Sequence, residues 1–212
     1  MKNLLISLSW FAPAIAGAGV ITVTNQNLSR AGDTVILTDT LPSTTGIATG
    51  GYFDTGYDVS AGLTTAMSTG SFADFISNYN ILTSDILGAS GGSGVNGFFF
   101  ASTDYGVPLL NPPVGAALYT FVGNGTSLST STAYALFSST LAVDLDSPAP
   151  DTNDILVGSN TTTLLGTVGT SMVNFGSGPQ STPTVTLLNT IPEPSTFFLS
   201  ALGVFGLLRR RR

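Results

Sequence analysis

Clusters of Gly, Pro, Asn and Ser divide the middle of this 212-residue chain into short apolar segments. Such clusters favour turns, whereas the β-branched and aromatic residues between them favour strands. The expected strands are 20–24, 33–39, 51–57, 95–101, 117–122, 133–138, 164–168 and 184–188, and the expected breaks are 46–51, 89–97, 111–113, 123–125, 148–153 and 176–183. We therefore predict an all-β fold, an antiparallel β-sandwich that is either jelly-roll-like or immunoglobulin-like.

A single short helix is expected within this β framework. Phe72, Phe75, Ile76 and Tyr79 follow one another at the spacing of one helical face, so the helix is predicted over 72–79. Ser71 is a candidate cap for its first turn, and Asp74 places a negative charge near its positive end.

The composition excludes several kinds of chemistry. Cys and His are both absent, which excludes a thiol nucleophile, a disulfide framework, a zinc site with nitrogen or sulfur ligands and an imidazole base. A serine nucleophile needs a base, and the one lysine, Lys2, lies at the chain start. We therefore predict no catalytic residues and no enzymatic activity.

Basic residues are concentrated at the two ends. Five of the six are Lys2 and Arg209 to Arg212, so the segment 17–191 contains eleven acidic residues and only Arg30, a net charge of −10. This balance argues against nucleic acid as a partner, because phosphates require a basic surface. It also favours polysaccharides that are neutral or bridged by divalent ions.

The first 18 residues have the order of parts found in a signal peptide. Lys2 supplies a positive start, an apolar run follows over 4–12, and small residues at Ala14, Ala16 and Ala18 offer cleavage sites at Ala16 or Ala18. The expected partners are signal peptidase and the general secretion machinery. The alternative is a buried first strand or helix.

The C-terminal end has three parts in a fixed order. Pro192, Glu193 and Pro194 precede an apolar segment over 197–208, which is followed by Arg209, Arg210, Arg211 and Arg212. Twelve helical residues span only about 18 Å, less than the ~30 Å hydrocarbon core, so a removable membrane helix is favoured over a permanent anchor. The arginines would hold this end in the cytoplasm and the rest of the chain outside.

Residues 192–212 resemble the sorting domain of PEP-CTERM proteins, which Gram-negative bacteria that make extracellular polysaccharide export. The resemblance implies an exosortase, a membrane-embedded cysteine protease, as processing partner, with cleavage near Pro192, Glu193 and Pro194. It also implies an inner-membrane-anchored intermediate that later reaches the cell envelope surface or the medium. The alternative is an ordinary tail-anchored or single-span protein.

One oxygen-rich cluster is a candidate calcium site. Hard cations take six to eight oxygen ligands, which carboxylates, an amide and loop carbonyls supply. The cluster consists of Asp144, Asp146, Asp151, Asn153 and Asp154. Its spacing does not match an EF-hand loop, and the alternative is a strand end leading into an exposed Pro-rich loop.

Two further groups of side chains are candidates for carbohydrate chemistry. Asp54 and Asp58 could form a carboxylate pair for glycoside hydrolysis, although a hairpin with polar ends gives the same spacing. Tyr52, Phe53, Tyr57, Tyr105 and Tyr119 could form a platform on which sugars stack, or could serve as core aromatics.

The predicted organisation is a signal peptide over 1–18, a β-sandwich body over 19–175, a stalk or last strand over 176–191, and the sorting signal over 192–212. The predicted function is that of an exported cell-surface or extracellular-matrix protein with a structural or adhesive role in extracellular polysaccharide or biofilm. The alternative is a carbohydrate-binding module, with Ca2+ as a candidate ligand.

Overall fold

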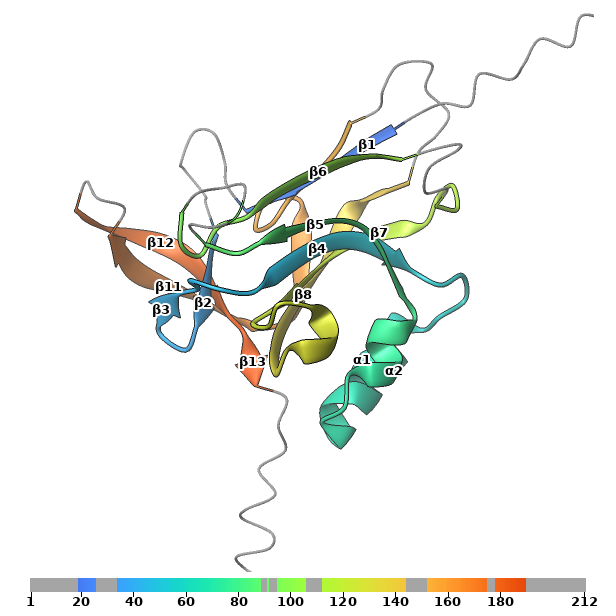
Figure 1. The fold of residues 1–212 in the computed structure, drawn as a ribbon, viewed down its shortest axis with the longest axis horizontal. Helices are drawn as coiled ribbons and strands as arrows, with labels where there is room; N and C mark the ends of the chain where they lie inside the picture. The colour runs from blue at the N-terminus through green and yellow to red at the C-terminus, as the bar shows by residue number, and fades with distance from the viewer. Residues whose placement is uncertain are drawn as a thin grey trace, which may run out of the picture.

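The computed structural model describes residues 19–25, 34–88, 91, 95–105, 112–143, 152–174 and 178–189. Most of these residues are in strands, with two α-helices and one 3-10 turn (Figure 1). The strands are β1 (Gly19–Thr24), β2 (Val35–Thr38), β3 (Leu41–Pro42), β4 (Ile47–Phe53), β5 (Tyr79–Ile86), β6 (Phe100–Tyr105), β7 (Ala117–Gly123), β8 (Ala133–Ala142), β9 (Thr152–Leu156), β10 (Thr161–Leu165), β11 (Thr167–Asn174), β12 (Pro179–Thr186) and β13 (Leu188–Asn189), and the helices are α1 (Val59–Thr69), α2 (Ala73–Ser77) and η1 (Leu128–Thr130).

The strands form three sheets. A three-stranded sheet has the order β6-β1-β9, a six-stranded sheet has the order β10-β8-β7-β4-β5 with β13 added beside β8, and a four-stranded sheet has the order β11-β12-β2-β3. The prediction of an all-β, mainly antiparallel fold is confirmed. Two neighbouring pairs, β1 with β9 and β12 with β2, are parallel.

The main core lies between the three-stranded and six-stranded sheets. Ile21 and Val23 of β1 are fully buried there and belong to one cluster with Leu118 and Val122 of β7. Because side chains alternate along a strand, Tyr119 and Phe121 of β7 point to the other face.

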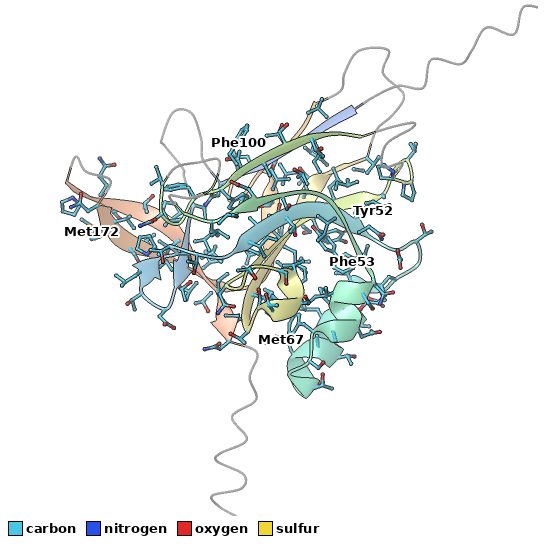
Figure 2. The ribbon with its side chains drawn as sticks, in the orientation of Figure 1. Tyr52, Phe53, Met67, Phe100 and Met172 are labelled. Carbon is cyan, nitrogen blue, oxygen red and sulfur yellow. The ribbon has the colours of Figure 1, made fainter. Side chains whose placement is uncertain are left out.

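That other face of the six-stranded sheet carries a second core, which we call the aromatic core. It consists chiefly of Phe53, Phe72, Phe75, Tyr79, Phe121 and Tyr134, and it is covered by α1, α2 and η1 (Figures 1 and 2). The central strands β4 and β7 of the six-stranded sheet are therefore buried on both faces, which explains the weak alternation of polar and apolar residues in them.

The predicted break at 46–51 is wrong, because residues 47–51 lie in β4 and not between strands. A Cβ atom at Gly50 would collide with the side chain of Val23, and one at Gly51 would collide with the backbone of Asn80. These glycines allow β4 to lie close to β1 and β5, and the register between β4 and β5 shifts at this pair. Glycine here indicates close packing and a bulge instead of a turn.

The helical region differs from the single predicted helix over 72–79. α2 ends at Ser77 and Tyr79 begins β5, while Phe72 is the N-cap and Ser71 makes no capping bond. α1 was not predicted because it is rich in Gly, Ser and Thr, which are weak helix formers. Its signals are local: the Asp58 side chain accepts a hydrogen bond from the Ala61 N–H at 2.9 Å, and Gly70 ends the helix at φ 68°.

Three strands fall outside the predicted set. β3 and β5 were not predicted, and β9 lies where the sequence predicts a Pro-rich break and a cation cluster. The segment 176–191, predicted as either a stalk or a last strand, contains β12 and β13. The predicted signal peptide, with Ala16 and Ala18, and the sorting signal over 192–212 lie outside the described residues.

Candidate functional site

A pocket of about 320 Å3 lies between the end of β4 and the turn that precedes β7. Residues 53–57 and Val59 form one wall, and residues 113–117 and Tyr119 form the other. Small-molecule pockets begin at roughly 300 Å3, so this one has the size for a small ligand.

Hydrogen bonds hold the wall that follows β4. The N–H of Asp54 donates to the carbonyl of Asn78 at 2.9 Å, and the N–H of Tyr57 donates to the carbonyl of Asp54 at 3.0 Å. The carboxylate of Asp54 also accepts from the Asn80 amide at 2.6 Å. This wall is therefore a hydrogen-bonded turn that is held to the start of β5.

The opposite wall is a turn fixed to the end of β8. The N–H of Gly115 donates to the carbonyl of Val143 at 2.7 Å, and the N–H of Val143 donates back to Ala116 at 2.8 Å. At the tip of this turn Val114 is 58% exposed. A substitution at Val114 can therefore change the pocket entrance without disturbing the core.

Three aromatic rings line the pocket in a continuous series. Phe53 stacks on Tyr57 at 5.5 Å between ring centroids and meets Tyr119 edge to face at 5.1 Å. Burial raises the pKa of both tyrosines, and the carboxylates of Asp74 and Asp58 raise the pKa of Tyr57 further. Both phenols stay protonated at neutral pH, so both rings are neutral.

The hydroxyl of Tyr57 lies against Gly62 of α1, in space that a Cβ atom would fill. Among the described residues this buried hydroxyl has no hydrogen-bond partner. The Tyr57 ring is instead positioned by its contacts with the rings of Phe53 and Phe75.

The predicted aromatic platform forms only in part. Phe53, Tyr57 and Tyr119 meet at the pocket, but Tyr52 points to the opposite face of β4 and packs on the main core. Neighbouring residues of a strand face opposite ways, so Tyr52 and Phe53 cannot share one surface. The side chain of Tyr105 lies outside the described residues. Pro113 and Val114 were missed, because only the pairing of β4 with β7 brings them here.

The carboxylates of Asp54 and Asp58 accept hydrogen bonds from different residues. Asp54 accepts from Asn80, and Asp58 caps α1. Both side chains are exposed. Asp54 is the only charged side chain among the lining residues that the structure describes. Hydrolysis by a carboxylate pair requires two carboxyl groups at the substrate, and the described lining provides one.

The candidate calcium cluster falls mostly outside the described residues. Asp144, Asp146 and Asp151 lie there, while Asn153 and Asp154 belong to β9, opposite Ile21 and Thr22 of β1. Over the described ranges, no group of three acidic residues is close enough to hold a metal ion. The calcium site stays a prediction.

Comparisons with known proteins identify the C-terminal segment. Residues 190–212 match the PEP-CTERM protein-sorting motif, which contains Pro192, Glu193, Pro194 and the arginine cluster. This confirms the resemblance found in the sequence and supports an exported protein that an exosortase processes. No curated protein and no solved structure matches the chain. None of the helices in the described residues is long and apolar enough to span a membrane.

Proposed function

Because the chain carries a PEP-CTERM sorting motif, we propose that its body serves a structural or adhesive role at the cell surface or in extracellular polysaccharide. The motif is the observation that carries this proposal. Two further features support it: a sheet whose central strands are buried on both faces gives the body a large core without disulfides, and its net charge of −10 favours binding of cations.

We expect processing to remove both ends of the chain in the native host. Intact-mass measurement of protein from the envelope and the medium should give a species that begins near Gly17 or Gly19 and ends between Pro192 and Pro194. Replacing Pro192, Glu193 and Pro194 together by Ala should leave the unprocessed chain in the membrane. The control is Pro183→Ala, an exposed proline in β12.

Recovery of a mature species that still contains residues 197–208 would contradict exosortase processing and would indicate a permanent anchor. A mature species from the triple-alanine variant would show that another protease cuts the chain. Deleting the host exosortase should reproduce the phenotype of the triple-alanine variant.

A second candidate function is the binding of a neutral glycan in the pocket. The rings of Phe53, Tyr57 and Tyr119 support it, since aromatic rings provide apolar surface for a sugar ring. Asp54 adds one acceptor for sugar hydroxyls. A neutral glycan is favoured over an acidic one because the body is negatively charged.

We expect Val114→Arg to abolish glycan binding by filling the pocket entrance. Isothermal titration with neutral cello-, xylo- and manno-oligosaccharides should show millimolar binding to the wild type and none to this variant. Met67→Arg is the control, because Met67 is 42% exposed on α1, outside the lining. Unchanged binding by Val114→Arg, or no binding by the wild type, would reject the pocket as the glycan site.

A further inference from the structure

β11 is an edge strand of the four-stranded sheet. Among the described strands it pairs with β12 alone, over eight residues from Thr167 to Asn174 without a register shift. Figure 1 shows the β11–β12 hairpin at the end of the molecule away from α1 and α2. Its outer edge can therefore be approached without displacing either helix.

The other described edge strands carry features that hinder pairing with another chain. Charges, prolines, bulges and short length all have this effect. β3 has two residues including Pro42, β13 has two residues, β5 contains Asp85, β6 contains Asp104, β9 contains Asp154, and β10 has five residues with a register shift. β11, with the sequence TVGTSMVN, has no charge, no proline and no shift. Among the described edge strands, β11 alone has none of the features that hinder pairing with another chain.

The ladder with β12 defines which backbone groups β11 directs outward. Thr170 lies opposite Pro183, which has no N–H to donate. In an antiparallel ladder a residue that does not exchange bonds with its opposite residue directs its N–H and C=O to the other edge. The outward groups are therefore those of Thr170 and, by alternation, of Val168 and Met172.

The same three residues include two exposed apolar side chains. Val168 is 65% exposed and Met172, labelled in Figure 2, is 66% exposed. Because side chains alternate along a strand, both lie on the same face as Thr170. On the opposite face Val173 packs with Val35 and Phe98. β11 is thus fixed to the body by one face and presents apolar side chains on the other.

The distribution of charge favours a second copy of the chain as the partner that pairs with the outer edge of β11. Residues 155–192 contain no charged side chain, whereas the segment 17–191 as a whole has a net charge of −10. Two copies repel each other over most of their surface and least along β10 to β13. A strongly basic partner would instead be expected to bind the acidic parts of the body.

We propose that two copies of the chain associate by antiparallel pairing of β11 with β11 about a two-fold axis at Thr170. In this register Thr170 faces Thr170 of the other copy, and Val168 faces Met172 of the other copy. Each exposed apolar side chain then gains an apolar cross-strand neighbour, and the outward backbone groups pair. The pairing is independent of the glycan pocket.

The absence of cysteine makes Thr170→Cys a specific test of this register. Directly opposite residues that exchange hydrogen bonds have Cα atoms about 5.5 Å apart, within the range that a disulfide spans. Mild oxidation of the protein recovered from its host should link most of the Thr170→Cys variant into dimers. The exposed control Thr65→Cys on α1 should stay unlinked.

Sedimentation equilibrium provides a second test, because it detects a weak dimer that oxidation alone could miss. Sedimentation equilibrium should show a dimer for the wild type, and Val168→Glu combined with Met172→Glu should weaken it at least tenfold by placing like charges opposite each other. Ile86→Glu, at a residue 53% exposed on β5, should leave the dimer intact. A monomeric wild type, or a dimer that neither links through Thr170→Cys nor weakens in the double variant, would overturn the proposal.

Discussion

Phe121→Ala is expected to lower the free energy of unfolding of the body by about 4 kcal/mol, the range for truncating a fully buried phenylalanine. Phe121 has no exposed surface and lies at the centre of the aromatic core. Its ring is 5.4 Å from Tyr134, 5.6 Å from Tyr79 and 5.7 Å from Phe75. These neighbours belong to β8, β5 and α2, so the cavity would weaken contacts among several elements.

Urea unfolding followed by circular dichroism measures this loss as a lower midpoint at an unchanged slope. The matched control is Phe100→Ala on β6, because Phe100 is 47% exposed and leaves little cavity. We expect the control to lose less than about 1 kcal/mol of its free energy of unfolding. A loss for Phe121→Ala as small as that expected for Phe100→Ala would mean that the aromatic core does not stabilise the body.

Whether a strand could be predicted depended on the residue composition of its segment. Segments with several β-branched or aromatic residues, such as 117–122 and 133–138, were predicted and correspond to β7 and β8. β5 was missed because Thr83, Ser84 and Asp85 dilute its apolar residues, and β9 because its polar residues suggested ion ligands. In both strands the pairing with neighbours, which depends on distant segments, decides the structure.

The candidate site was less predictable than the fold. Phe53, Tyr57 and Tyr119 were recognised as aromatics, but their common location depends on the pairing of Gly51 with Tyr119 between β4 and β7. Val114 carries no pattern that marks it as part of a pocket. The sorting motif was predictable because it is contiguous, with Pro192 to Pro194 next to its apolar and basic segments.

Asn25 is a buried polar residue that ties three segments together through its side chain. Its amide donates to the carbonyls of Thr34 at 2.8 Å and Gly97 at 2.7 Å, and its side-chain oxygen accepts from the N–H of Phe99 at 2.9 Å. Asn25 has no exposed surface, so water cannot readily replace these bonds.

Asn25→Ala is therefore expected to lower the free energy of unfolding by about 3 kcal/mol, measured by urea unfolding. It removes the side-chain partner of the Phe99 N–H and of the Thr34 carbonyl in the core, and the Gly97 carbonyl keeps only its bond from the N–H of Ile36. Asn124→Ala is the matched control. Asn124 also bonds through its side chain, accepting from the N–H groups of Thr132 at 2.8 Å and Ala133 at 3.1 Å, but it is only half-buried. Water can take over its bonds, and we expect a loss of about 1 kcal/mol.

Asn25→Asp tests the donor role of the amide without changing the size of the side chain. The introduced carboxylate would face two carbonyl oxygens, and burial would raise its pKa in the folded protein above the unfolded value. Below the pKa of this carboxyl group in the unfolded state, the group is protonated in both states and can donate one hydrogen bond, so the free energy of unfolding falls least there. The loss of free energy of unfolding grows as the pH rises through the pKa of the folded state, because the unfolded state releases the proton more readily. A loss independent of pH would contradict the burial of this side chain against the carbonyls of Thr34 and Gly97.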